Sequence, residues 1–465
     1  MNKTIVNIFW ASLISLMISL CFSINLMLSW FILCLFCVFI FVFFFLRKSD
    51  RSIAILLLVF LYPILPFHAG IDLLPRLLPV FTLHRVILAL MFLLWISGRN
   101  NLTQSISSFP LNRLFAFLFV VIFISGLFST AKSATFFYLG TFVLEFYFFS
   151  VMFFDLASDE RFINRIIKFV VISAFVAAMI GIIEFITRFN IYSWVRPYRE
   201  GLEYAITTQI REGDVRIRGA FDHAISFGVF LAFGAVSAIY LYSITKHAFK
   251  RIFYVMIFLI LFLAVFLTLS RTSILALLVS VAIYLIIKKG KKELVICSSL
   301  FIFSLIQPFF FNVYREKLFL LVKGSVLPFS VTYKHFAGSV FSRLEMIQAM
   351  MKLIWEKPFL GHGKIYFGNY FIDNYYIGFA LSFGLIGLIG LVVLVCKIFY
   401  MAVHVSVGSL SRDNKLFSQM MLSVLIGLLL VWLTLALTSY FYLIWIYVGI
   451  LCRLYISNRK TFVKK

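Results

Sequence analysis

Three short groups of charged and polar residues interrupt a chain that is otherwise strongly apolar. They are RGAFDHAISFGVF at 218–230, LTLSRTSILALL at 267–278 and PFLGHGKIYFGNYFIDNYYIGFALSFGLIG at 358–387. Each group leads into an apolar stretch of the kind that crosses a bilayer. An arginine held at the edge of a membrane usually pairs with something, and its planar guanidinium suits phosphate. The sequence therefore predicts that an anionic group binds where these helices meet the membrane surface.

Arg218 and Arg271 occupy the most restricted positions. Arg218 is followed by Gly219 and Ala220, which would let a ligand approach the backbone. Arg271 lies in LSRTS, a hairpin with almost no loop between two apolar stretches. The alternative for both is a side chain that extends to a lipid headgroup.

Two long polar segments, about 188–223 and about 312–374, hold further basic residues. The additional candidates for binding the anion are Arg196, Arg199, Arg216 and Arg343. The alternative is a solvated loop surface whose charge is balanced by acidic residues such as Glu203 and Asp222.

The third group follows a predicted amphipathic helix on the membrane surface. Ser342 and Glu345 have the spacing of a capping box, which favours a cap for Glu345, with a catalytic carboxylate as the alternative. The apolar face is formed by Leu344, Ile347, Met351 and Ile354, and Pro358 ends the run.

A tight turn, GHGK, then carries His362, and Asp373 and Asn374 stand where the next apolar stretch begins. Below them, four glycines allow close helix packing: Gly378, Gly384, Gly387 and Gly390. Glu145, near the centre of another apolar stretch, is either a functional carboxylate or a protonated group hydrogen-bonded between helices.

Composition indicates which kind of element positions these residues. Of 465 residues, 63% are hydrophobic and only 13% are charged, which is far more apolar than a soluble domain. The chain is predicted to be an all-α polytopic membrane protein with about fourteen transmembrane helices. We expect them near 8–27, 28–46, 53–67, 84–97, 113–129, 134–155, 166–187, 224–244, 252–268, 272–287, 293–311, 375–398, 419–438 and 440–455.

Seven short basic loops, among them RKSDR at 47–51 and KKGKK at 288–292, fall on one side of this arrangement. The positive-inside rule makes that side cytoplasmic and places both termini there. The two long segments, 188–223 and 312–374, are then large periplasmic loops. They separate helical regions at 1–187, 224–311 and 375–465, the last with a basic cytoplasmic tail.

The net charge of +24 has the same explanation, together with contact with anionic headgroups, so we expect no nucleic acid partner. The first apolar stretch is long and no cleavage site follows it, so we expect it to be retained. The six cysteines lie in apolar stretches, which predicts no disulfide.

The three groups, in this order, resemble the O-antigen polymerase and O-antigen ligase superfamily. The resemblance runs from about 196 to 395, and FTLHRVILAL at 81–90 is also typical. It implies a glycosyltransferase of the bacterial inner membrane with a GT-C-like architecture. Its substrates would be undecaprenyl-diphosphate-linked oligosaccharides, and a chain-length regulator could be a partner. No Asp-x-Asp motif is present, so we expect metal-independent transfer, no cofactor, and arginines in place of the ion.

Ligases of this superfamily usually have a His-Asn pair where this chain has Asp373-Asn374, which favours a polymerase. Asp373 is the first candidate for the base that takes the acceptor proton, and His362 and His223 are alternatives. Asn374, Tyr375 and Asp222 are candidates for binding the glycan or the acceptor. The competing class is a transporter or flippase, but internal repeats are not evident and the charges gather at one membrane face.

Overall fold

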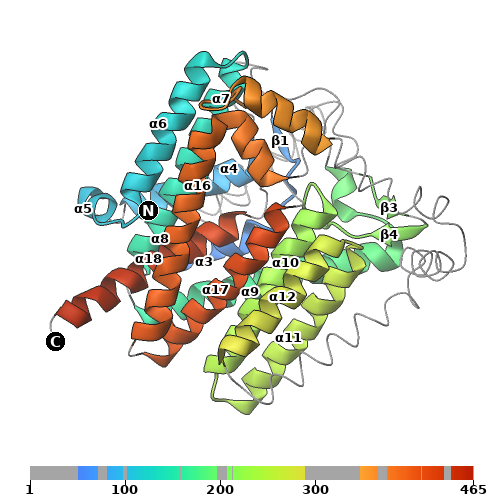
Figure 1. The fold of residues 1–465 in the computed structure, drawn as a ribbon. Helices are drawn as coiled ribbons and strands as arrows, with labels where there is room; N and C mark the ends of the chain where they lie inside the picture. The colour runs from blue at the N-terminus through green and yellow to red at the C-terminus, as the bar shows by residue number, and fades with distance from the viewer. Residues whose placement is uncertain are drawn as a thin grey trace, which may run out of the picture.

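The structure is a computed structural model that describes residues 51–71, 81–97, 102–157, 159–195, 207–211, 213–288, 346–364, 374–409, 411–433 and 441–463 (Figure 1). These residues are mostly helical. They also include two short antiparallel pairs, β1 (Gly70–Ile71) with β2 (Phe81–Thr82) and β3 (Gln209–Arg211) with β4 (Asp214–Arg216). The expected helical fold agrees with this, and the short strand pairs are confined to segments that connect helices.

The helices are α3 (Arg51–Leu61), α4 (Leu83–Ser97), α5 (Leu102–Ser107), α6 (Asn112–Phe128), α7 (Lys132–Thr141), α8 (Phe149–Leu156), α9 (Glu160–Thr187), α10 (Ala224–Ile244), α11 (Ala248–Leu267), α12 (Arg271–Lys288), α16 (Tyr375–Gly408), α17 (Arg412–Trp432) and α18 (Phe441–Val463). Residues 346–356 are also helical. A short 3-10 helix, Ile191–Trp194, follows α9.

Seven helices in the described part of the chain are long and apolar enough to cross a membrane, and three shorter apolar helices accompany them. This agrees with a multi-pass membrane protein. The expected spans at 8–27, 28–46 and 293–311 lie outside the described residues, so the total of about fourteen stays a prediction. Hydropathy misplaced some ends, because it marks only the apolar part of a helix: α16 continues to Gly408, and α17 begins at Arg412.

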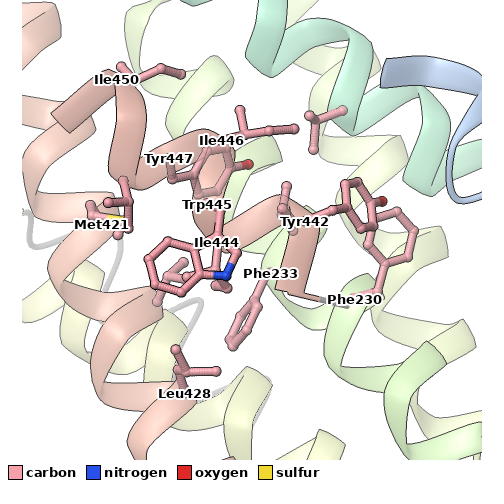
Figure 2. Packing of buried hydrophobic residues seen from close by; sticks show 14 of the residues in the cluster. Phe230, Phe233, Met421, Leu428, Tyr442, Ile444, Trp445, Ile446, Tyr447 and Ile450 are labelled. Carbon is pink, nitrogen blue, oxygen red and sulfur yellow. The ribbon is translucent and has the colours of Figure 1, made fainter. Parts of the chain in front are cut away.

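Helix α10 is the centre of the bundle. It packs against α9, α11, α12 and α17 (Figure 1). Most of its side chains are buried. Gly228 lets α10 approach the α11–α12 hairpin, because a Cβ there would lie 2.5 Å from the Ser273 Oγ. Figure 2 shows Phe230 and Phe233 of α10 in the same core as Met421 of α17 and Trp445 of α18.

The helix that contains Glu145 has an irregular centre. Residues Phe142–Phe148 form a π-helical segment between α7 and α8. The Glu145 Oε1 lies 3.6 Å from the Nε of Arg85, in the first turn of α4, and both side chains are about one-third exposed. The partner of Glu145 is therefore an arginine, a pairing that the sequence alone did not predict.

Helix α16 is broken at Gly384, whose φ is +69°. The segment 358–364 closes the break: the N–H groups of His362 and Gly363 donate to the carbonyls of Leu381 (2.9 Å) and Ser382 (2.8 Å). The N–H of Leu385 donates to the Pro358 carbonyl at 2.7 Å. Gly384 therefore allows both the break and the close approach of 358–364, and Gly390 packs closely against α6.

The helix at 346–356 lies against the first part of α16, but its buried stripe differs from the expected one. Met346, Met350 and Ile354 pack on Ala380 and Leu381. Met351, expected on the apolar face, is 41% exposed. Arg343 and Glu345, expected at the start of an amphipathic helix, lie outside the described residues.

Candidate active site

The first residues of α10 and α12 lie next to each other. His223 caps α10 by accepting the N–H of Ile225 at its Nδ1 (3.1 Å). The Ser273 hydroxyl, in the first turn of α12, donates to the Ile225 carbonyl at 3.1 Å. Two helix N-termini, each the positive end of a helix dipole, therefore lie side by side.

Arg216 is held beside this pair of N-termini by the strand β4. Its Nε donates to the Thr268 carbonyl at 2.9 Å, and the N–H of Ile217 donates to the Leu267 carbonyl at 3.2 Å. Arg271 is the first residue of α12 and is exposed. Only three residues separate α11 from α12, so the expected tight hairpin is confirmed.

Arg218 is one of the most buried large side chains in the described structure, with 1% of its surface exposed. Its backbone N–H donates to the Glu184 Oε2 at 3.1 Å, and its charge acts on both Glu184 and His68. We call His68, Glu184, Asn190, Arg216, Arg218 and His223 the Arg218 cluster. Arg218 therefore lies in a buried polar cluster, and its expected place at the membrane interface stays a prediction.

The segment 62–71 closes one side of the Arg218 cluster and links it to the region that contains FTLHRVILAL. The N–H of Phe67 donates to the Ala220 carbonyl at 2.9 Å. The Phe67 ring stacks on His84 at 3.8 Å and lies 4.9 Å from the Phe221 ring. Two sequence motifs that lie far apart in the chain therefore meet through one aromatic side chain.

Both histidines of the Arg218 cluster are held in the neutral form. Burial and the charges of Arg216 and Arg218 lower the pKa of His223 to about 4. Burial and the charge of Arg218 lower the pKa of His68 to about 4 as well. The Nε2 of His68 lies 3.0 Å from the Val195 carbonyl, so this nitrogen carries the proton.

Three further predicted residues, His362, Asn374 and Tyr375, lie on α16 or against it. The His362 Nε2 donates to the Leu353 carbonyl at 2.8 Å, and this bond ties the turn to the preceding helix. Asn374 caps α16 by accepting the N–H of Ile377 (3.1 Å). Tyr375 is buried, stacks on Trp432 at 4.8 Å and is hydrogen-bonded to Tyr138.

The structure thus brings Arg216, Arg218 and His223 together. His362 is bonded to α16 at Leu381, whereas Asn374 and Tyr375 lie at the start of that helix. Asp222 is half-buried, immediately before the cap of α10. Four candidates lie outside the described residues: Arg196, Arg199, Arg343 and Asp373.

Sequence reasoning did not identify three members of the Arg218 cluster: His68, Glu184 and Asn190. Glu184 did give a signal, because it is an acidic residue in the last turn of an apolar helix, where the helix dipole disfavours it. Asn190, just beyond the end of that helix, caps the 3-10 helix that follows by accepting the N–H of Tyr192 at 2.8 Å.

Within the described residues, the structure contains no group of three or more His, Cys, Asp or Glu side chains suited to a metal ion. Metal-independent transfer stays a prediction.

Comparison with known protein families gives a match to the part of the chain that runs from α11 to α16. Residues 256–392 match the O-antigen ligase family. The resemblance to the O-antigen polymerase and ligase superfamily is confirmed over this stretch, which runs from α11 to α16 and includes Arg271, His362 and Asn374. Members of this family are glycosyltransferase-like enzymes. No curated protein matches the chain.

Arg216 and Arg218 lie before the matched stretch, but hydrogen bonds connect their segment to it. Arg216 donates to Thr268, and the Ser273 hydroxyl joins α12 to α10. The part that resembles the superfamily and the arginines that precede it therefore form one continuous structure.

Proposed function

We propose that this chain is an O-antigen polymerase, one of the two activities named for its superfamily. It would transfer the growing glycan from undecaprenyl diphosphate to a sugar hydroxyl of the next lipid-linked repeat unit. The reaction would take place at the periplasmic face of the bacterial inner membrane. The observation that carries the proposal is the gathering of Arg216 and Arg218 at the paired N-termini of α10 and α12.

In this reaction the bond between the sugar C1 and the diphosphate oxygen breaks, and the acceptor oxygen bonds to C1. The diphosphate leaves with an added negative charge, which arginines and helix N-termini stabilise. The acceptor hydroxyl loses its proton to a base. Arg218 and Arg271 are proposed to bind the diphosphate, with Arg216 beside them.

Asp373 remains the first choice for the base, and two observations support that order. His223 has a pKa of about 4, and its Nδ1 already accepts a backbone N–H. His362 uses its Nε2 to hold the Leu353 carbonyl. Both histidines have a structural task in the described part of the chain. Asn374 and Tyr375, next to Asp373 in sequence, are proposed to lie near the acceptor.

The second candidate is an O-antigen ligase, which the description of the matched family favours. A ligase would transfer the finished glycan to the lipid A-core. Asp373, at the position where ligases usually have histidine, favours the polymerase.

Deletion of the gene separates these activities. If the chain is the polymerase, the surface lipid should carry a single repeat unit, because the ligase elsewhere in the cell still works. Bare core, with polymer left on undecaprenyl diphosphate, would identify a ligase and refute the polymerase proposal. Accumulation of lipid-linked repeats on the cytoplasmic side would identify a flippase. A gel of extracted lipopolysaccharide and an assay of repeat orientation measure all three outcomes.

A further inference from the structure

Glu184 is a buried carboxylate to which the proposed reaction assigns no role. It lies in the last turn of α9 and is 2% exposed. Its Oε2 accepts the backbone N–H groups of Arg218 (3.1 Å) and Gly219 (2.9 Å). Its Oε1 accepts the Asn190 Nδ2 at 2.9 Å. A carboxylate removed from water in this way costs free energy unless such bonds and an opposite charge compensate it.

These contacts fix the backbone on both sides of the Arg218 side chain. Gly219 has a φ of +54°, so the chain turns sharply directly after Arg218. The Asn190 Nδ2 also donates to the Gly219 carbonyl at 3.1 Å. Both backbone groups of Gly219 are therefore held, and the direction in which Arg218 leaves the main chain is set by Glu184 and Asn190 together.

Glu184 is also opposite in charge to the side chain whose backbone it holds. The charges of Glu184 and Arg218 act on each other across the cluster. An arginine that is 1% exposed needs a negative neighbour to stay charged without water. The backbone that carries this guanidinium is therefore held in place before a ligand phosphate binds. Preorganisation of this kind favours strong electrostatic stabilisation.

We propose that Glu184 is a positioning residue for Arg218: it orients this arginine toward the diphosphate of the lipid-linked substrate. The inference rests on the proposed function, in which Arg218 binds that diphosphate. Glu184 itself does not touch the substrate. Glu184 therefore affects ligand binding only by way of Arg218. A carboxylate that only stabilises the fold would have no such dependence on Arg218.

The test is binding of farnesyl diphosphate, a short polyprenyl diphosphate, to the purified full-length protein in detergent. The affinity is measured for the wild type, Glu184→Gln, Arg218→Lys and the double variant. Gln keeps the shape of Glu but presents an amide where the carboxylate accepts. We expect Glu184→Gln and Arg218→Lys each to weaken binding about tenfold or more. The double variant should bind no more weakly than Arg218→Lys alone, within about twofold.

Ser173→Ala is the matched control. Ser173 lies on the same helix, is buried, and donates to the Phe60 carbonyl at 2.6 Å. Its loss removes a buried hydrogen bond of α9 far along the helix from Arg218, so the affinity should stay at the wild-type value. If Glu184→Gln does not fold, Asn190→Ala takes its place in the same cycle, because it removes the other side chain that holds Gly219.

Wild-type affinity in folded Glu184→Gln would overturn the inference, and so would losses that multiply in the double variant. A wild-type protein that fails to bind farnesyl diphosphate would overturn it as well, because Arg218 would then have no diphosphate to meet. The polymerase proposal is judged separately, by the deletion strain. A bare-core phenotype would reject the polymerase and leave the binding result intact, since a ligase uses the same diphosphate.

Discussion

Arg218 and Arg271 have different surroundings although both are proposed to bind one diphosphate. Arg218 is buried and its backbone is held by Glu184, whereas Arg271 is exposed at the first residue of α12. A buried arginine on a fixed backbone can define where the diphosphate binds, and an exposed arginine can move with the ligand. Both roles depend on the planar fork of the guanidinium, which lysine lacks.

We expect Arg218→Lys and Arg271→Lys to lose long-chain glycan severely, on the order of a hundredfold, at a normal level of protein. Lysine keeps the charge but cannot form the paired hydrogen bonds. The measurement is the ladder of lipopolysaccharide lengths on a gel, with the protein quantified through a C-terminal tag. Normal chain length in both variants would remove these residues from the site.

Asp373→Asn should reproduce the deletion phenotype, because it removes the proposed base and keeps the shape of the side chain. Loss of activity of about 10²-fold or more is expected, measured on the same gel. Full activity in Asp373→Asn would leave the polymerase proposal standing and transfer the role of base to a histidine or to the acceptor's own surroundings.

His223 makes stability depend on pH. Its pKa is lowered from 6.5 to about 4 in the folded protein, so the unfolded chain takes up a proton first as the pH falls. The contribution of His223 is therefore fully present above pH 6.5 and is lost as the pH falls toward 4. His223→Asn keeps a side chain that can cap α10 and removes this proton uptake.

The measurement is thermal unfolding in detergent at several values of pH in this range. His223→Asn should lose less stability than the wild type over it, by about 1 kcal/mol after allowance for partial exposure. His68 supplies a similar dependence in both proteins. Equal losses in the two proteins would show that His223 does not titrate as the structure indicates.

At the residue scale, the sequence predicted those residues whose type is unusual for their position in the chain. Arg218 and Arg271 were identified because charged residues at the edge of an apolar stretch are rare. Glu184 and Asn190 were not, because their importance lies in hydrogen bonds to a backbone 35 and 29 residues away, respectively. Neither spacing nor composition reveals such a pairing.

Among the helices and strands, α16 is the one whose conformation depends most on a single residue, Gly384. A Cβ at Gly384 would lie 2.0 Å from the Phe359 carbonyl oxygen, and its φ of +69° is unfavourable for any other residue. Gly384→Ala should therefore destabilise the protein by about 3 kcal/mol or more. Thermal unfolding and the yield of monodisperse protein in detergent measure this.

Gly140→Ala is the matched control in α7, because a Cβ there meets nothing within 4 Å. It should be neutral or stabilise by about 0.5–1 kcal/mol. If Gly384→Ala unfolds at the same temperature as Gly140→Ala, the break in α16 does not have the geometry described.

Apolar length predicted where most of these helices lie and missed their irregular parts. The π-helical segment around Glu145 and the break at Gly384 are both surrounded by apolar residues, so hydropathy continues through them unchanged. The turn GHGK was expected to be tight, and its glycines do have positive φ. That it closes the break in α16 could not be seen, because the bonds join backbone groups and carry no residue signature.

For the whole molecule, the proposed function requires the segments 188–223 and 312–374 to face the periplasm. Single cysteines at Glu203 and Ser330, both outside the described residues, should react with an impermeant maleimide in intact spheroplasts. The background must lack the native cysteines. Labelling that occurs only after lysis would reverse the orientation and refute a mechanism at the periplasmic face.

At this scale, the class of protein followed from composition alone, since no single soluble core could use so much apolar surface. The composition did not show which helices lie side by side. The central position of α10 comes from small residues that permit close approach, such as Gly234 against Ala174 of α9. Such contacts depend on pairs of helices, and a single sequence specifies only one helix at a time.

The break in α16 also has a bearing on the order in which the protein is made. The partners of its freed backbone groups are Pro358, His362 and Gly363, together with the Ser125 hydroxyl, which donates to the Ser382 carbonyl at 3.0 Å. All of them precede Gly384 in the chain, so they leave the ribosome before it does. When the interrupted helix enters the bilayer, these four partners, which complete its hydrogen bonds in the described part of the chain, have already been synthesised. The reverse order would expose bare carbonyls to lipid.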